Sequence, residues 1–433
     1  MSEVIHNAVH RGAWRLTLSV LVALLISAAS LVYGQNKDGG KAVPAQGDSG
    51  VRVLDIRKIV WPQPPNIARV KYVSFFAGEK LPDFKNAKKK KSGWMDRVAG
   101  VQADDGGVGA AMNNHFFLGE PHGLAVDAAG KKVYVSDGKV GAIFIFDIET
   151  HDTEMIKNGK QANFGLIMGL ALDDTDRLFV ADSGAHRVLV FNSKHRPEAS
   201  ITQGLVEPIG LAIDNENRYL YVADIGADQI VVYDADTFEL LRRIGTGGKN
   251  HTLTSPGDFA KPTGVAVDKD GNLYVADMLN ARIEIFDADG NFVRTFGKRG
   301  DGPGYFAMPK GVAVDCDGHI WVTDPMQNRV QVLSPEGKLL LYMGNGRGIL
   351  PGMFSGVQYV TIDKSNRVFT SEVYPGRVQE FRYVTQAEAQ VEFANREAEK
   401  SKRATVSSRS AMPPKSTTAA ESKAAPNKDS AAK

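Results

Sequence analysis

The chain has 433 residues, 43% of them hydrophobic and 24% charged, and its formal net charge is +2 at pH 7. This composition is that of a folded protein with an apolar core, and the small net charge gives no strong electrostatic attraction for any class of partner. The single cysteine, Cys316, excludes a disulfide within the chain, and no CxxCH motif is present to attach a c-type haem. We expect no cofactor.

The N-terminal segment predicts export. Arg11 and Arg15 precede an apolar run at residues 16–32, so residues 1–34 fit either a cleaved signal peptide or a retained membrane anchor. Both alternatives place the protein in the periplasm or cell envelope of a bacterium, and the second adds membrane association through residues 16–32. Residues 35–59, which begin with a stretch rich in Gly, Lys, Asp and Pro, predict a flexible linker.

Residues 60–384 form the predicted propeller domain, and residues 120–383 of it contain one sequence unit in six copies, of which the last is degenerate. Each copy has a segment related to P-x-G-[LV]-A-[VI]-D, and a second acid follows that Asp after nine or ten residues. The copies are 41 to 54 residues apart, a period within the range expected for propeller blades. The first acids are Asp127, Asp173, Asp214, Asp268, Asp315 and Asp363, and the second acids are Asp137, Asp182, Asp224, Asp277, Asp324 and Glu372.

Each copy predicts four antiparallel strands. In the fourth copy we expect them at residues 264–268, 273–277, 282–286 and 292–296, because Val, Ile, Phe and Tyr suit a pleated, half-buried surface. The sixth copy supplies only three strands, and a strand-like segment at residues 69–76 precedes the first copy. Pairing the two removes an exposed sheet edge. The predicted fold is an all-β, six-bladed propeller whose last blade is closed by an N-terminal strand.

Three segments lie outside the repeated units. Residues 79–118 predict a loop insertion, and its lysine run at residues 88–91 fits a solvated loop better than a site for an anionic surface. Residues 385–403 have the composition of a short helix. Residues 404–433 are rich in Ala, Ser, Lys and Pro and predict a disordered tail.

The repeated unit resembles the NHL repeat. The segments P-x-G-V-A-V-D, L-Y-V-A-D, R-I-x-I-F-D and G-x-G-x-F follow one another as in that family, and residues 300–306 are the closest stretch. The resemblance covers residues 60–383 and implies a six-bladed propeller, while residues 61–65 look like the start of exported bacterial members. It implies an architecture and not an activity, because function depends on the sites that a fold carries.

The mouth of the central channel is the expected ligand site. The x residue of each P-x-G segment starts an innermost strand there, which gives His122, Met168, Ile209, Thr263, Lys310 and Gln358. Lys310 is able to hold an anionic group, although a solvated lysine at the rim is the simpler interpretation. His122 suits either a ligand or general base, or a hydrogen-bonded residue that only lines the channel, and we favour the lining role.

Two enzyme families of this architecture use metals at such positions. Peptidyl-amidoglycolate lyases place three His around zinc, and gluconolactonase-like propellers use Glu, Asn and Asp oxygens for a calcium-type cation. The six positions here hold one His and no carboxylate, with Glu120 and Glu207 just outside them and His251 in a loop. We therefore predict no catalytic metal and no catalytic residue among the six.

The sequence favours an exported, non-catalytic recognition or scaffold propeller that binds an envelope protein, a peptide or a small ligand at the channel mouth. Nucleic acid is not an expected partner, because that function needs a basic face with interleaved aromatic residues, and export removes the protein from the nucleic acid. The alternative is a divergent metal-dependent hydrolase or lyase, lactonase-like or peptidyl-amidoglycolate-lyase-like, that uses His122 with Glu120 or Glu207.

Acids and arginines five residues apart recur in four copies. A catalytic group is needed once in a site, so this repetition predicts a structural role in each hairpin. The expected pairs are Asp182–Arg187, Asp277–Arg282, Asp324–Arg329 and Glu372–Arg377.

Overall fold

The structure is a computed structural model that describes residues 55–79, 116–159, 162–248, 250–344 and 346–410, the last eight of these by their backbone alone. The predicted signal peptide or anchor lies outside the described residues. So do most of the predicted linker, most of the loop insertion with its lysine run, and residues 411–433 of the tail. In the described part of the chain, no helix combines the length and the hydrophobicity needed to cross a bilayer.

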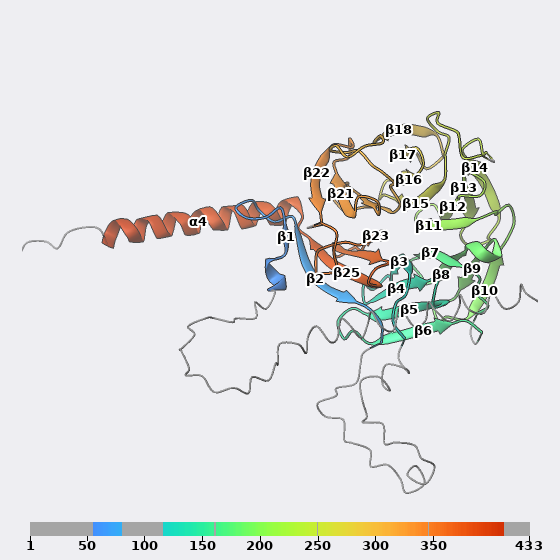
Figure 1. Cartoon of the computed structure of the whole chain (residues 1–433), viewed down its shortest axis with the longest axis horizontal. Helices are drawn as coiled ribbons and strands as arrows, with labels where there is room; N and C mark the ends of the chain where they lie inside the picture. The colour runs from blue at the N-terminus through green and yellow to red at the C-terminus, as the bar shows by residue number, and fades with distance from the viewer. Residues whose placement is uncertain (1–54, 80–115, 160–161, 249, 345, 411–433) are drawn as a thin grey trace, which may run out of the picture. The chain divides into compact units, whose positions relative to one another are not determined.

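The described chain forms six antiparallel sheets arranged as a ring (Figure 1). Blade 1 contains β3 (Pro121–Val126), β4 (Lys132–Asp137), β5 (Ala142–Asp147) and β6 (Thr153–Lys157); blade 2 contains β7 (Ile167–Leu172), β8 (Leu178–Asp182), β9 (Arg187–Phe191) and β10 (Pro197–Ile201). Blade 3 contains β11 (Pro208–Asp214), β12 (Tyr219–Asp224), β13 (Gln229–Asp234) and β14 (Leu240–Ile244); blade 4 contains β15 (Pro262–Val267), β16 (Leu273–Asp277), β17 (Arg282–Phe286) and β18 (Phe292–Phe296). Blade 5 contains β19 (Val312–Val314), β20 (Ile320–Asp324), β21 (Arg329–Leu333) and β22 (Leu339–Met343); blade 6 contains β23 (Val357–Ile362), β24 (Arg367–Glu372), β25 (Arg377–Tyr383), β2 (Val70–Phe76) and β1 (Val60–Trp61). Short 3-10 turns lie at Ile56–Lys58 and Ser183–Ala185.

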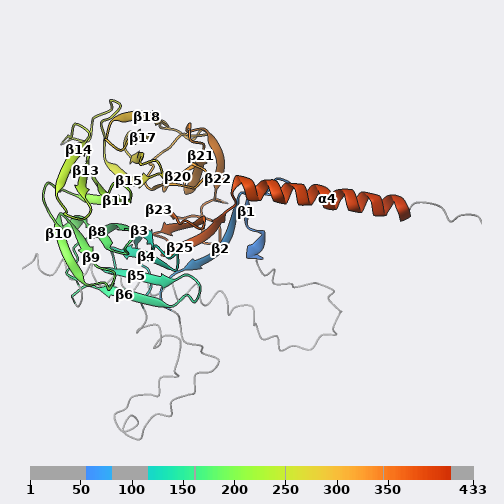
Figure 2. The same ribbon diagram turned by 180° about the vertical axis from the view of Figure 1, so that it is seen from behind.

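The ring closes through blade 6, as predicted. Strand β2 pairs with β25 in antiparallel register, with Phe76 opposite Val378 and Val70 opposite Tyr383. Strand β1 then adds a fifth strand outside β2, which the sequence did not predict. The innermost strands β3, β7, β11, β15, β19 and β23 each contact the next, and β23 contacts β3. Figure 2 shows the same ring from behind.

Apolar side chains between neighbouring blades form the core. Between blades 1 and 2, for example, Tyr134 and Ile143 pack in one cluster with Leu178, Val180 and Phe191, and all five are buried. Burial of this kind is the main favourable contribution to folding. Each face of a blade is covered only when the neighbouring blade is present, so the stability of the array depends on the whole ring.

The glycine of the P-x-G segment permits close packing of inner strands. A Cβ atom on Gly123 would lie 2.4 Å from the carbonyl oxygen of Met168, and one on Gly210 would lie 2.0 Å from that of Thr263. These distances exclude any side chain at those two positions. The glycine of one blade therefore packs on the backbone of the x residue in the next blade.

The two repeated acids have structural roles. The first acid caps the turn after each innermost strand; Asp268 Oδ1, for example, accepts the backbone N–H groups of Asp270 and Asn272, both at 2.9 Å. The second acid accepts N–H groups from the loop that leads into the innermost strand of its own blade. Asp137 Oδ2 accepts from Gly119 at 2.6 Å, and Glu372 Oε2 accepts from Ser355 at 2.9 Å. All twelve acids follow one of these two patterns.

Three of the four predicted acid–arginine pairs form. The nitrogen–oxygen distances are 3.1 Å for Arg187–Asp182, 2.9 Å for Arg282–Asp277 and 2.9 Å for Arg377–Glu372. The prediction for Asp324 and Arg329 is wrong. Arg329 Nε donates instead to Gln327 Oε1 at 2.8 Å, and both oxygens of Asp324 are occupied by backbone N–H groups.

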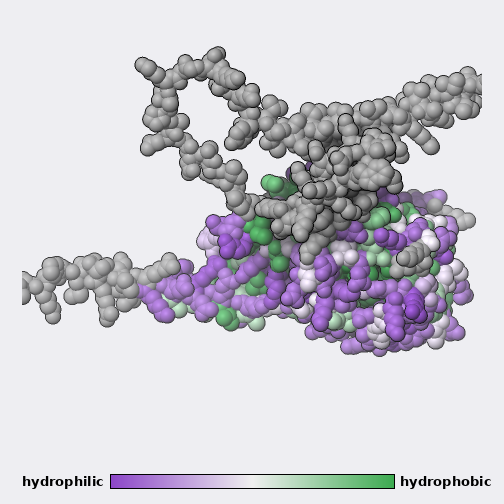
Figure 3. All heavy atoms as spheres, turned by 90° about the horizontal axis from the view of Figure 1, so that it is seen from below, coloured by the Kyte–Doolittle hydropathy of each residue, from purple (hydrophilic) through white to green (hydrophobic). Residues whose placement is uncertain are grey.

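The C-terminal helix α4 spans Gln386–Ser410, so it runs beyond the predicted end at residue 403, and the first seven residues of the predicted disordered tail are helical. A capping box starts it, since Thr385 N donates to Glu388 Oε2 at 2.9 Å and Glu388 N donates to Thr385 Oγ1 at 3.3 Å. An ion pair of 3.4 Å joins Lys71 on β2 to Glu392. Figure 3 shows the described part of α4 as mostly hydrophilic.

Candidate functional site

The structure brings the six predicted mouth residues to the same end of the six innermost strands, and we call them the mouth ring. They are His122, Met168, Ile209, Thr263, Lys310 and Gln358. The side of the propeller on which they lie is the mouth face. Ile209, Thr263 and Gln358 are buried, and the other three are partly buried. The ring is therefore a largely desolvated set of side chains, although four of the six are polar or ionisable.

Lys310 carries the only formal positive charge of the mouth ring at neutral pH. Its Nζ donates to Gln358 Oε1, and Gln358 Nε2 donates to the carbonyl oxygen of Gly356 at 2.9 Å. Among the described residues, no carboxylate forms an ion pair with Lys310, and burial lowers the pKa of its ammonium group to about 8. Lys310, for which a solvated position at the rim was the simpler interpretation, is only partly exposed, and its ammonium group has one uncharged partner.

His122 faces the same region. Its Nδ1 is buried and has no hydrogen-bond partner in the described part of the chain. Burial, and to a smaller extent the nearby ammonium group of Lys310, lower the pKa of His122 to about 4. The imidazole is therefore neutral at pH 7. The described residues supply no hydrogen bond to Nδ1, so the hydrogen-bonded lining role expected for His122 stays a prediction.

Tyr359 lies directly beneath the mouth ring and is a residue that sequence reasoning missed. It stands where the other copies have the glycine of P-x-G. Its N–H donates to Ser371 Oγ at 3.1 Å, as that of Gly311 does to Thr323 Oγ1 at 2.8 Å. Its hydroxyl reaches across the channel from blade 6 to blade 3 and donates to the carbonyl oxygen of Ile209 at 3.4 Å. The signal was present in the sequence, because the sixth copy reads V-Q-Y where P-x-G is expected.

A cavity of about 270 Å³ lies on the other side of Tyr359. The inner strands line it with apolar residues, Tyr359 is part of its wall, and none of the mouth ring is among its lining residues in the described chain. A second cavity of about 190 Å³ shares Val126, Leu172 and Ile362 with the first and lies toward the far end of the channel. The tyrosine therefore separates the mouth ring from the rest of the channel.

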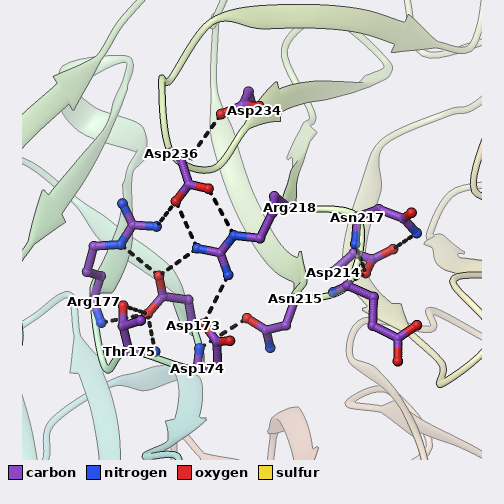
Figure 4. Close-up of polar contacts among 11 residues, drawn as sticks. Asp173, Asp174, Thr175, Arg177, Asp214, Asn215, Asn217, Arg218, Asp234 and Asp236 are labelled. Carbon is purple, nitrogen blue, oxygen red and sulfur yellow. Dashed lines mark hydrogen bonds and ion pairs between the residues drawn. The ribbon is translucent and has the colours of Figure 1, made fainter.

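The far end of the channel has a network of charges that we call the far rim (Figure 4). Asp173 pairs with Arg177 at 2.7 Å, and Asp236 pairs with Arg177 at 2.7 Å and with Arg218 at 2.9 Å. Arg218 also pairs with Asp174 at 2.9 Å. Hydrogen bonds from Arg218 are the main reason why the pKa of Asp236 falls to about 2. Since these side chains hold blades 2 and 3 together and satisfy one another, the far rim is structural.

The donors at the mouth do not fit a catalytic metal. A zinc site needs three protein ligands and a calcium site needs several oxygen ligands, whereas the ring offers one imidazole beside an ammonium group. Glu120 and Glu207 are exposed, and His251 Nδ1 bonds to Asp228 Oδ1 at 2.7 Å. Over the described residues, no group of three or more His, Cys, Asp or Glu side chains is placed to hold a metal ion.

Family models match three parts of the chain. A model described as a 6-bladed beta-propeller matches residues 262–411, the SMP-30/Gluconolactonase/LRE-like region matches residues 196–298, and the NHL repeat matches residues 167–191. The prediction of NHL repeats in a six-bladed propeller is thereby confirmed.

Two curated relatives share parts of the sequence. The probable peptidyl-alpha-hydroxyglycine alpha-amidating lyase pgal-1 of Caenorhabditis elegans is 41% identical over 87 residues, which cover 20% of this chain and 24% of that protein. NHL repeat-containing protein 2 of Homo sapiens is 29% identical over 161 residues, which cover 31% of this chain and 22% of that protein. The chain spans less than a quarter of the length of either relative.

Solved structures with a related fold include a streptogramin B lyase, with 13% identity and a TM-score of 0.47 over 61% of this chain and 94% of that one. A gluconolactonase from Xanthomonas campestris has 17% identity and a TM-score of 0.48 over 61% of this chain and 88% of that one. Because the family models fall on a chain whose sheets close into a ring of six, this protein is a six-bladed β-propeller of the NHL-repeat type.

Proposed function

We propose that this propeller is a recognition module that binds the anionic group of a ligand at the mouth ring. One observation carries the proposal. Lys310 is a largely desolvated ammonium group without a carboxylate partner among the described residues, and His122 beside it has a buried nitrogen without a hydrogen bond. Both features cost stability in the free protein, and a bound anion removes both costs.

The donor set supports binding over metal-assisted catalysis. An ammonium group in the ring repels a divalent cation, and a neutral imidazole alone does not supply a metal site. Tyr359 gives the site a floor and does not supply a base, because burial raises the pKa of its hydroxyl far above neutral pH. A partner held here is an envelope protein, a peptide or a small ligand, and the role is that of a receptor or scaffold.

We propose the periplasm or cell envelope of a bacterium as the location. This proposal rests on the apolar run at residues 16–32 that follows Arg11 and Arg15. Fusing residues 1–54 to a reporter that is active only outside the cytoplasm tests it. Reporter activity is expected, and an inactive reporter would contradict export.

The competing function is that of a divergent metal-dependent lyase or hydrolase. It draws support from the local identity to the amidating lyase of Caenorhabditis elegans and from the presence of His122 in the mouth ring. Elemental analysis of dialysed protein separates the two functions. We expect less than one equivalent of zinc or calcium. One equivalent that disappears in His122→Ala would establish the enzyme function instead.

Anion binding gives the direct test. Sodium acetate at constant ionic strength should raise the melting temperature of the wild-type protein and of Lys269→Met, which removes an exposed lysine from a turn at the opposite end of blade 4. It should have no such effect on Lys310→Met. Equal responses of all three proteins would contradict the proposed function.

A further inference from the structure

We infer that the anionic group bound at the mouth ring is the C-terminal carboxylate of a polypeptide whose last residues are apolar. This inference rests on the proposed function and adds the chemical class of the ligand. It follows from the charge of the mouth ring, from its donor atoms and from the surface around it.

The charge of the mouth ring fits a monoanion. Lys310 supplies one positive charge, and His122 stays neutral at pH 7 because burial and the ammonium group disfavour its protonation. A dianion such as a phosphate monoester would bring a second negative charge into a desolvated region without a partner for it. A carboxylate brings one negative charge and leaves no charge unpaired.

The donors also fit a carboxylate. Lys310 Nζ has three N–H groups and one acceptor, Gln358 Oε1, in the structure. His122 Nδ1 is able to donate in one of the two neutral tautomers and is unsatisfied. The remaining polar groups are occupied, since Gln358 Nε2 bonds to Gly356 and the hydroxyl of Tyr359 bonds to Ile209. Two free donor groups match the two oxygen atoms of one carboxylate.

The floor and wall of the mouth beside these donors are apolar. Met168 and Ile209 belong to the mouth ring, and the aromatic ring of Tyr359 lies beneath it. Ile209 and Tyr359 are buried and Met168 is partly exposed, so an amino acid side chain that follows the carboxylate would displace water mainly from Met168.

Exposed apolar side chains continue outward over the mouth face, and we call them the apolar collar. They lie in the loops that lead into innermost strands or in the hairpins that follow the second acids. The strand registers, such as Pro208 opposite Asp224, put both kinds of loop on the mouth face. The collar comprises Leu166, Val206, Leu279, Met326, Leu350 and Tyr374.

The apolar collar favours a polypeptide C-terminus over an aliphatic acid as the source of the carboxylate. Its members come from blades 2 to 6 and so surround the mouth on several sides. An unbranched aliphatic acid has too narrow a body to contact several sides at once. A polypeptide that enters by its C-terminus presents side chains in several directions around one carboxylate, and it is the occupant to which this geometry points.

The test uses a fluorescein-labelled peptide ending in Ala-Leu-Val-Leu, as the free acid and as the C-terminal amide, with fluorescence anisotropy as the readout. We expect the acid to bind wild-type protein at least tenfold more tightly than the amide. Lys310→Met should bind the acid and the amide equally weakly. Lys269→Met, the matched control, should behave as the wild type, and Met326→Ser should weaken both peptides by a smaller factor.

Other outcomes identify which statement has failed. If the acid and the amide bind the wild type equally, or if octanoate competes as well as the peptide acid, the inference is wrong. If inorganic phosphate binds through Lys310 and the peptide acid does not, the inference is wrong and the proposed function stands. If the binding of the peptide acid, of octanoate and of phosphate does not depend on Lys310, both the inference and the proposed function are wrong.

Discussion

The two ends of the central channel differ in whether their charged side chains have partners of opposite charge. At the far rim, Arg177 and Arg218 each pair with two or more carboxylates, and the buried Asp173 is fully satisfied. At the mouth, Lys310 has no carboxylate partner in the described chain and His122 has an unsatisfied nitrogen. This difference is one of the observations that support the proposed ligand site at the mouth.

The largest effect should come from breaking a repeated pair. Arg377 is buried, pairs with Glu372 at 2.9 Å and donates to the carbonyl oxygens of Ile349, Leu350 and Met353. Arg377→Ala leaves Glu372 buried without its cation and should lower the free energy of unfolding by about 3–5 kcal/mol. Urea denaturation measures this loss.

Arg329→Ala is the matched control for that variant, because it stands at the same position of the repeat and has no ion pair with Asp324. We expect a loss of about 1 kcal/mol or less, the size of a single hydrogen bond. Equal losses for the two variants would show that the repeated acids do not depend on their arginines.

Glu284 is a buried acid of blade 4 that extends the comparison to the interior of a blade. Its Oε1 lies 3.1 Å from a guanidinium nitrogen of Arg282. Gln331 and Gln379 occupy its position in the next two blades, and Gly304 N donates to Gln331 Oε1 at 3.2 Å as Gly257 N donates to Glu284 Oε1 at 3.2 Å. The second oxygen of Glu284 is buried and has no partner among the described residues. Burial raises the pKa of Glu284 to about 7.

The ionised form of Glu284 is therefore the destabilising one, and its cost is absent below pH 4.5 and complete above pH 7. Glu284→Gln should raise the free energy of unfolding at pH 8 by about 2 kcal/mol, and the gain should vanish toward pH 4.5. Urea denaturation at several pH values provides the check. A gain that does not depend on pH would mean that ionisation is not its source.

Lys310→Met should raise the free energy of unfolding by less than Glu284→Gln does, and its gain should vanish at high pH and not at low pH. The pKa of Lys310 falls from 10.5 to about 8, so its ammonium form is destabilising below pH 8 and its cost disappears above pH 10.5. Since the side chain is partly exposed, we expect a gain of about 1 kcal/mol at pH 7 together with loss of anion binding. A destabilised Lys310→Met would show that the lysine is structural.

Arg218→Ala at the far rim should change the free energy of unfolding least. Unlike Glu284→Gln and Lys310→Met, it should lower that free energy. Its ion pairs with Asp174 and Asp236 are partly exposed, and Asp173 keeps Arg177. The expected loss in the free energy of unfolding is about 0.5–1 kcal/mol, and it should shrink in 1 M salt because solvent ions screen exposed pairs. A gain in stability would remove the contrast between the two ends of the channel.

Much of the fold was predictable because the sequence unit is repeated. Six copies in register predicted six blades, and the missing strand of the last copy predicted the pairing of β2 with β25. Strand β1 was missed because two residues with three prolines nearby give little strand signal. The end of α4 was placed too early because composition alone does not mark where a helix ends.

The candidate site was predictable in position and not in chemistry. Counting along the repeat placed the six residues at one end of the innermost strands, where the structure has them, but it gave no information on how far Lys310 is buried. It also overlooked Tyr359, which the repeat marks only as a missing glycine. The predicted pair of Asp324 and Arg329 does not form, because Gln327 in the same hairpin accepts the hydrogen bond of the arginine instead.

The sequence by itself determined the number of blades, the closure of the ring and the identity of the residues at its mouth, because these follow from local periodicity and from the register of the copies. Only the tertiary structure decided which charges are paired. Desolvation depends on what packs around a group from other blades. His122 comes near Lys310, and Tyr359 reaches Ile209, only when the ring closes.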